Sequence, residues 1–331
     1  MNFMKQLQQK AKSAPKKVVY PESGEEKILR AAREALNMGI AHPILIGKKE
    51  TILGFAQGLG ISLDGMEFAD HMNEGKLNDY TNELIKLNDV LSAGAASLIL
   101  KDPLSFAAMM LHQGEADAMV AGLTYATEMV IMMSKMIVGM QEGIETPSSI
   151  FLMKIPGYEG PEGDLLVFAD CGVVPDPNPS ELADIAISSA GTVRTLLGWE
   201  PRVALLSFST KGSAQHPKVE FVLEALKIIQ EREPNLCVDG ELQVDAAIVP
   251  EVAAKKVPDG SPVAGRANIL IFPDLNAGNM AYKLVQRLAK ADAYGPFLQG
   301  FAKTVSDLSR GSSTDDIVGV TTMAVVRAQM L

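Results

Sequence analysis

The chain has 331 residues and a formal net charge of −10, with 47% hydrophobic and 21% charged residues. This length allows two domains of ordinary size, and the composition is that of a globular protein with a large core. No apolar run approaches the about eighteen residues of a membrane span, and the negative charge argues against nucleic acid or an acidic membrane surface as the main partner.

The N-terminal stretch, residues 1–17, contains basic residues but lacks the apolar core of a secretory signal, so we expect a short surface helix. Cys171 and Cys237 are the only cysteines, and their spacing matches neither a metal site nor a redox motif. A reducing, cytoplasmic location is therefore expected, without a disulfide.

Short apolar runs alternate along the chain with longer segments of helical periodicity. In chain order, strands are predicted at 16–21, 43–47, 117–122, 165–170, 202–208, 237–241 and 267–273. Helices are predicted at 25–39, 126–140 and 217–233 and from about 314 onward.

The predicted strands are apolar throughout, which is typical of parallel sheets covered by helices on both faces. They are too many for one sheet, so we expect two α/β domains with three αβα layers each and a cleft between them. Turn residues at 141–149 mark the boundary. The first domain is predicted to comprise 1–148 and 300–331, and the second 149–299.

The segment 308–319, "LSRGSSTDDIVG", gathers an arginine, hydroxyls and carboxylates before the last helix. Ser313 is well placed as the N-cap, with Asp316 completing a capping box, and this alone explains the hydroxyls and carboxylates. It does not explain the preceding residues. Gly311 lets a ligand approach the backbone, and Arg310 offers a fork that matches phosphate beside a helix N-terminus.

Three further segments resemble loops at the carboxyl ends of strands, where α/β proteins bind ligands. Turn chemistry explains each one singly, but together they favour a ligand site. They are 268–288, which presents Asn276, Asn279 and Lys283, 292–311, which presents Gly295, Pro296 and Gln299, and 205–217.

Taken as a whole, the sequence resembles the phosphate acetyl/butyryltransferases. The resemblance rests on "VVYPESGEEKILRAA", "FADCGVVPDPNPSELADIAISSA", "DGELQVDAAIVPEVA", "FPDLNAGNMAYK", "GPFLQG" and "DLSRGSSTDDIV", which span nearly the whole chain. It implies two domains like those of isocitrate and isopropylmalate dehydrogenases, a homodimer, and a site in the interdomain cleft. It also implies reversible acetyl transfer between acetyl-CoA and phosphate, with coenzyme A as substrate and neither metal nor nicotinamide.

The same resemblance implies that Ser309, Arg310 and Asp316 are the catalytic group. Asp316 would accept the proton of the thiol, Arg310 would neutralise charge on the phosphoryl group, and Ser309 would donate to the carbonyl oxygen or the thiol. Thr127 would cap the helix that follows it, near a binding loop. It joins Asn279, Lys283, Gly295, Pro296 and Gln299 as candidate substrate-binding residues.

Two arginines that many relatives carry in the first domain are missing here. Ile85 or Lys86 stands at the first position and Met132 at the second. Lys86 and Lys135 could replace the charge of these arginines but not their bidentate geometry.

Other conspicuous residues have simpler explanations. Methionines 129, 132, 133, 136 and 140 recur at helical spacing, which indicates an apolar face in the core or at a subunit contact, with a substrate-facing stripe as the alternative. Cys171 is interpreted as a buried small residue rather than a nucleophile. His42, His71, His112 and His216 show no paired spacing and are expected to be structural or exposed.

Competing functions remain open at this stage. An oxidoreductase would share the implied fold, but the sequence has neither G-x-G-x-x-G after a strand nor G-x-x-x-x-G-K-[ST]. A non-catalytic sensor of acetyl-CoA or acetyl phosphate is a second alternative, and transfer of longer acyl chains such as propionyl or butyryl is a third.

Overall fold

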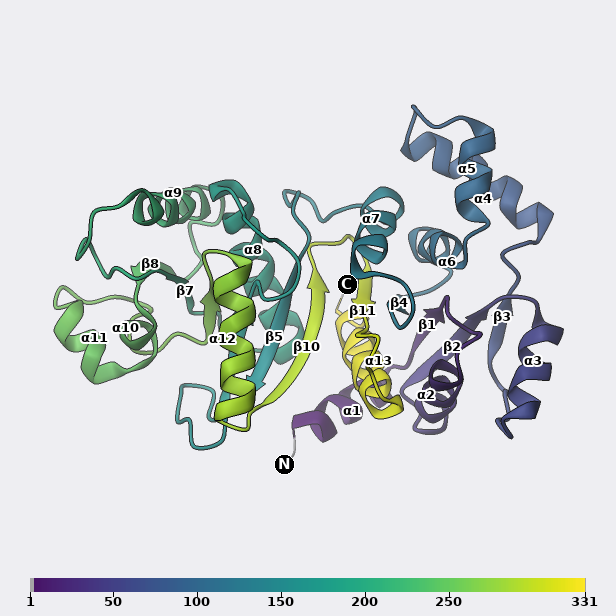
Figure 1. Ribbon diagram of the computed structural model, residues 1–331, viewed down its shortest axis with the longest axis horizontal. Coiled ribbons are helices and arrows are strands. Elements are labelled where there is room, and N and C mark those ends of the chain that lie inside the picture. The colour runs from purple at the N-terminus through teal and green to yellow at the C-terminus, as the bar shows by residue number, and fades with distance from the viewer. Residues whose placement is uncertain (1–2, 331) are drawn as a thin grey trace. The chain divides into compact units, whose positions relative to one another are not determined.

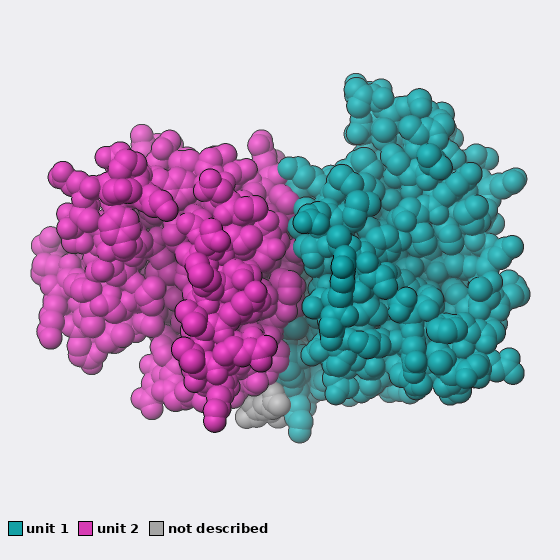
Figure 2. Space-filling model, viewed as in Figure 1, with its two compact units in different colours: residues 1–141, 301–331 teal, residues 142–300 magenta. Residues whose placement is uncertain are grey.

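The computed structural model describes residues 3–330, and helices alternate with strands through most of the chain (Figure 1). Two compact units divide it, one made of residues 1–141 and 301–331 and the other of residues 142–300 (Figure 2). The first unit is therefore built from two stretches that are distant in sequence.

The first unit contains a five-stranded sheet in which every neighbouring pair is parallel. The strand order is β11-β4-β1-β2-β3, so β1 lies at the centre, with the next two strands on one side of it and β4 and β11 on the other. The direction of winding thus reverses between β1 and β4, which is where such sheets bind ligands. The strands are β1 Lys16–Tyr20, β2 Ala41–Ile46, β3 Glu67–Ala69, β4 Ala118–Ala121 and β11 Thr304–Asp307.

Helices cover both faces of this sheet. All four side chains of β4 are buried although successive ones point to opposite faces, and both α6 and α13 contact β4 and β1. The final helix also packs on α1 and α2, so it belongs to the first unit. The helices of this unit are α1 Phe3–Ser13, α2 Glu26–Asn37, α3 Lys49–Gly58, α4 Glu74–Leu87, α5 Ala93–Leu100, α6 Pro103–His112, α7 Thr127–Ile137 and α13 Thr314–Ala328.

The second unit contains a six-stranded, mixed sheet in the order β10-β5-β6-β9-β7-β8. Strand β5 runs antiparallel to both of its neighbours, and the remaining pairs are parallel. The chain leaves β7 toward β8 and leaves β9 toward β10, so the winding reverses between β7 and β9. The strands are β5 Ser148–Lys154, β6 Leu165–Ala169, β7 Val203–Leu206, β8 Val238–Leu242, β9 Ile269–Ile271 and β10 Asp292–Gln299.

Helices of five to sixteen residues connect these strands (Figure 1). They are α8 Pro179–Thr192, which continues as a π-helical turn over Val193–Leu197, α9 Pro217–Arg232, α10 Val244–Ile248, α11 Pro250–Lys256 and α12 Leu275–Leu288. Helices α8 and α9 pack on each other, whereas α12 packs on β5, β6 and β10. The predicted class, two α/β units with mostly parallel sheets, is confirmed.

Each of the seven predicted strands and four predicted helices is present, and α1 confirms the expected N-terminal helix. The prediction of a loop over 292–311 was wrong in part, because this segment contains strands β10 and β11. Gly295 and Pro296 are tolerated there because β10 is an edge strand and its register with β5 shifts between Tyr294 and Phe297. The loop predicted between the strand and the helix of 268–288 is shorter than expected, since α12 begins at Leu275 and so includes Asn276 and Asn279.

Within residues 3–330, none of the helices has both the length and the apolar composition of a membrane span on its own, and only the bent pair α5 and α6 reaches them together.

Candidate active site

The N-terminus of α13 is held by the predicted capping box. Ser313 is the N-cap, and its Oγ accepts from the Asp316 amide at 3.2 Å. In return, Asp316 Oδ2 accepts from the Ser313 amide at 2.8 Å and from the Ser313 hydroxyl at 2.8 Å. No donor within residues 3–330 occupies Asp316 Oδ1, so one oxygen of this exposed carboxylate is available for chemistry.

The loop before this helix is exposed and folded on itself. The Ser312 amide donates to the Ser309 carbonyl at 2.9 Å, and the Gly311 amide approaches Ser309 Oγ at 3.3 Å. Arg310 has no hydrogen-bonding or ionic partner within the part of the chain that the structure describes. Its guanidinium is therefore free, on a residue four positions before α13 begins.

Lys27 adds a second cation that the sequence analysis missed. It lies in the first turn of α2, and its ammonium donates to the Ser312 carbonyl at 2.9 Å. Nothing in the local pattern around Lys27 distinguishes it from an ordinary surface lysine, because its partner lies 285 positions away. The contact ties the loop before α13 to the start of α2.

The loop after β4 is organised by a buried glutamate from the neighbouring strand. Glu22 follows β1 and is 6% exposed. Its Oε2 accepts from the amides of Gly122 and Leu123, and its Oε1 accepts from the Thr124 amide and hydroxyl and from the Tyr125 amide. The amides of this loop are consequently satisfied by the protein itself.

Asp307, the last residue of β11, is a second buried carboxylate at this edge. It is 3% exposed, and its Oδ2 accepts from the Thr127 hydroxyl at 2.6 Å, while Oδ1 has no hydrogen-bond partner. Burial raises the pKa of Asp307 to about 6, against the lowering effect of the Thr127 bond. Gly122 must be a glycine, because its φ is +105° and a Cβ would lie 2.1 Å from Asp307 Oδ1.

The expected role of Thr127 as a cap was wrong. The N-cap of α7 is Ala126, which has no side chain to bond the first turn. The Thr127 hydroxyl bonds Asp307 instead, which fixes the start of α7 beside the end of β11. Its predicted role in substrate binding stays a prediction.

These groups converge because β11, β4 and β1 are adjacent and parallel. Neighbouring strands lie about 4.8 Å apart, so the loops that follow them meet at one edge. The structure thus brings Ser309, Arg310 and Thr127 to one edge of the first unit, together with Glu22 and Lys27.

The remaining predicted site residues lie in the second unit. Asn279 donates from Nδ2 to the Cys171 carbonyl at 3.0 Å, and the Lys283 ammonium lies 5.7 Å from the centre of the Tyr282 ring. Gln299 is fully buried, and its Nε2 donates to the hydroxyls of Ser148 and Ser189 at 2.9 Å each.

Gly295 and Pro296 belong to edge strand β10. A Cβ on Gly295 would lie 2.7 Å from the Ile150 carbonyl oxygen, so packing against β5 accounts for this glycine. The roles of Gly295, Pro296, Gln299, Asn279 and Lys283 in substrate binding stay predictions.

Cys171 is fully buried, as expected for a small core residue. Burial, followed by the charge of Asp170, raises the pKa of the Cys171 thiol, which disfavours the reactive thiolate. His216 is the N-cap of α9 and accepts from the Lys218 amide at 3.1 Å, a structural role. Within residues 3–330, no group of three or more His, Cys, Asp or Glu side chains is arranged to hold a metal ion.

The lysines proposed to replace the missing arginines both lie exposed in the last turn of a helix. Lys86 lies in the last turn of α4 and forms an exposed ion pair with Glu83 at 2.9 Å. Lys135 is an exposed residue in the last turn of α7. The predicted single methionine face is divided, since Met133 is buried whereas Met129 and Met132 are exposed.

The model of the phosphate acetyl/butaryl transferase family matches residues 2–325 of the chain. The chain belongs to this family. A phosphate acetyltransferase of Thermoanaerobacterium thermosaccharolyticum is 47% identical over 99% of the chain and the whole of that relative. A phosphotransacetylase from Streptococcus pyogenes, 36% identical, superposes with a TM-score of 0.93 over 99% of both chains.

A structural neighbour outside the family supports the dehydrogenase-like fold. A putative 4-hydroxythreonine-4-phosphate dehydrogenase from Salmonella typhimurium superposes with a TM-score of 0.56 over 95% of this chain and 99% of its own. At 12% identity, this similarity concerns the fold alone. The family and fold that the sequence motifs implied are thereby confirmed.

Proposed function

We propose that this member of the family transfers an acetyl group reversibly between coenzyme A and phosphate, with the loop before α13 as its catalytic centre. The observation that carries the proposal is that one short segment bears both the free guanidinium of Arg310 and the carboxylate of Asp316, whose Oδ1 is unoccupied. The names of the relatives supply the reaction class, and this edge supplies groups suited to an anionic acyl phosphate and a thiol.

The reaction is an attack of the coenzyme thiol on the carbonyl carbon of acetyl phosphate. A C–S bond forms, the bond between that carbon and the phosphate oxygen breaks, and phosphate leaves with the electron pair. The thiol proton passes to Asp316. Transfer from an ordinary thiol to an ordinary carboxylate is uphill by about 6 kcal/mol, so desolvation of the site or direct stabilisation of the thiolate must offset this cost.

Arg310 neutralises the phosphoryl group and the oxygen that becomes negative during the attack, a contribution of about 3 to 4 kcal/mol for a preorganised donor. The hydroxyl of Ser309, which accepts only a long bond from Gly311, donates to the carbonyl oxygen or the thiol. Lys27 holds the loop through the Ser312 carbonyl. Coenzyme A enters as a substrate, and the proposed reaction uses neither a metal nor a nicotinamide.

A homodimer is part of the proposal, supported by an exposed apolar stripe on α12. Met280, Leu284 and Leu288 recur every four residues and are 57%, 58% and 79% exposed. Only Gly278 of this helix is buried. Such a stripe is typical of a protein contact. Sedimentation velocity tests it, and a monomer with wild-type sequence would remove this part of the proposal.

A cytoplasmic location is proposed because both cysteines are free, which suits a reducing compartment.

The decisive experiment follows thioester formation by ultraviolet absorbance, with acetyl and butyryl phosphate compared at equal coenzyme A. We expect turnover with acetyl phosphate to exceed that with butyryl phosphate. The opposite preference would assign the chain to longer acyl groups. Calorimetric binding of acetyl-CoA without any turnover would instead support the sensor alternative.

A further inference from the structure

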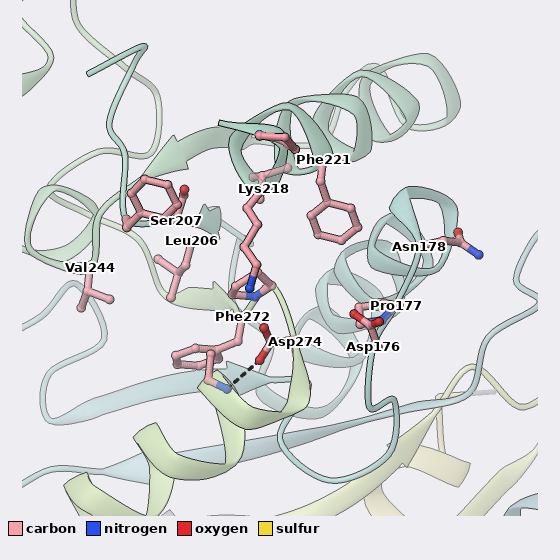
Figure 3. Close-up of a pocket in the computed structure, with 15 residues that line it drawn as sticks. Asp176, Pro177, Asn178, Leu206, Ser207, Lys218, Phe221, Val244, Phe272 and Asp274 are labelled. Carbon is pink, nitrogen blue, oxygen red and sulfur yellow. Dashed lines mark hydrogen bonds between the residues drawn. The ribbon is translucent and has the colours of Figure 1, made fainter. Parts of the chain in front are cut away.

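A cavity of about 710 Å³ lies in the second unit, and none of the residues assigned above to the transfer reaction is among those that line it (Figure 3). It opens where the chain leaves β7 and β9, the point at which the winding of this sheet reverses. Its wall contains Leu206 and Ser207 from β7 and its loop, and Phe272 and Asp274 from the loop after β9. Reversal points of this kind are preferred ligand sites in α/β folds.

Apolar and aromatic side chains form most of the cavity wall. Phe221 projects from α9, Phe272 follows β9, and Phe208, which is 54% exposed, follows β7. No aromatic ring within residues 3–330 stacks on Phe221, whose side chain lines the cavity. Aromatic faces of this kind stack on planar rings at separations of about 4.5 to 7 Å between centres.

Three charged groups interrupt this apolar wall without neutralising one another. Figure 3 shows Lys218 reaching from α9 toward Phe272 and Asp274, with Asp176 across the cavity. Within the described chain Lys218 forms no ion pair. Asp274 uses Oδ1 to cap α12 through the Ala277 amide at 2.9 Å, which leaves Oδ2 without a bond.

These groups define the chemistry of a ligand. Two carboxylates and one ammonium leave one net negative charge, which disfavours a phosphate-rich molecule. Asp176 and Asp274 call for hydrogen-bond donors, Lys218 calls for an acceptor, and the phenylalanines call for a flat ring. We propose that the cavity binds a heteroaromatic base that carries both donors and acceptors on its edge, such as the purine of a nucleoside.

The size of the cavity supports a base with an attached sugar. Small-molecule sites typically measure about 300 to 1,000 Å³, and a value of about 710 Å³ exceeds what a single amino acid needs. The amino group of adenine donates to one carboxylate, and a ring nitrogen accepts from Lys218. The same ring occurs in free nucleosides and in the nucleotide portion of coenzyme A, so both sources must be tested.

The test is isothermal titration calorimetry of the full chain with adenosine. We expect saturable binding to the wild type and a loss of about fivefold to 100-fold in affinity in Phe221→Ala, the range found when a stacking partner of a base is removed. Lys218→Gln and Asp274→Asn are expected to weaken binding at least severalfold. Asparagine also caps helices, so Asp274→Asn removes the charge while keeping the start of α12.

Lys227→Gln on the same helix is the matched control, because Lys227 is an exposed residue outside the cavity wall. It should bind adenosine like the wild type. Competition between adenosine and coenzyme A then identifies which molecule supplies the base. Displacement of adenosine by coenzyme A assigns the site to the base of the coenzyme, whereas binding of both together assigns it to a separate nucleoside.

Absence of saturable adenosine binding would overturn the inference. So would equal affinity in the wild type, Phe221→Ala and Lys218→Gln. Because binding is measured without turnover, failure of the proposed transfer reaction would leave this result unaffected.

Discussion

Two neighbouring loops of the first unit differ in whether their polar groups are bonded within the protein. After β4, the amides of residues 122–125 all point to Glu22, a carboxylate of the protein itself. After β11, the loop at 308–313 leaves Arg310 exposed and unpaired. The first loop cannot accept a phosphate while Glu22 fills it, so the difference separates a rigid wall from the place where an anion can bind.

The second unit repeats the closed arrangement twice. Asp170 accepts from the amides of Gly172, Val173 and Val174 and is 3% exposed. Glu241 accepts from the Ser209 hydroxyl and the Gly212 amide. Buried carboxylates thus organise several loops at the strand ends, which makes the open loop before α13 the exception among them.

Removing the proposed base, Asp316, should have the largest effect on turnover. Asp316→Ala is expected to lower kcat about 1,000-fold, within the range for a general base, and steady-state kinetics measures it. Part of any loss would come from the capping box. Ser313→Ala is therefore the control, since it breaks the capping box and leaves the Asp316 carboxylate in place. Wild-type kcat in Asp316→Ala would remove Asp316 from the mechanism.

Loss of the free guanidinium should have the next largest effect. Arg310→Ala is expected to lower kcat about 100-fold, because a preorganised donor to the developing charge disappears. Arg310→Lys should recover only part of this loss, since an ammonium keeps the charge but not the planar fork. Equal rates for Arg310→Ala and the wild type in the same assay would exclude the role of this side chain.

Replacing Glu22 should increase the dynamics of the loop at residues 122–125. Glu22→Gln replaces one accepting oxygen by a donor among backbone amides, which leaves donors unpaired at a cost of about 1 to 3 kcal/mol. Hydrogen exchange at residues 122–125 should accelerate at least about tenfold. Glu25→Gln, an exposed neighbour, serves as the control. Unchanged exchange in Glu22→Gln would show that another contact holds the loop.

The smallest expected effect concerns Asp307 and pH. Its pKa is raised to about 6 in the folded chain, so between its unfolded value and this one the folded state binds more protons. The carboxylate therefore destabilises the fold above about pH 6, and this cost is relieved as the pH falls below that value. Asp307→Asn keeps an acceptor for Thr127 and removes the titration.

Calorimetric unfolding at about pH 5 and about pH 7 measures this effect. The wild type should lose a few degrees more of Tm on going to the higher pH than Asp307→Asn does. Identical pH dependence in the two proteins would contradict the assignment.

The sequence revealed features whose causes are local. The fully buried strands β4 and β9 show as continuous apolar runs, and the capping box at Ser313 needs only residues three apart. Strand β10 was missed because Gly295 and Pro296 carry the signals of a turn, and only pairing along a sheet edge makes them part of a strand.

The contacts that hold the loops of the candidate site could not be predicted either, because they join residues that are distant in sequence. Glu22 reaches residues about 100 positions away, and Lys27 reaches Ser312 across 285 positions. Such contacts depend on the order of strands in the sheet, which periodicity does not encode. The catalytic assignment came from a motif, whereas its framework came only from the folded chain.

The first unit borrows its last strand and helix from residues 301–331, beyond the whole of the second unit. During synthesis, the edge of β4 that pairs with β11 stays unpaired until β11 has been made, and unpaired strand edges promote aggregation. Ser309, Arg310 and Asp316 lie on this late segment, so under the proposed mechanism the nascent polypeptide acquires its catalytic groups only when residues 301–331 have been synthesised.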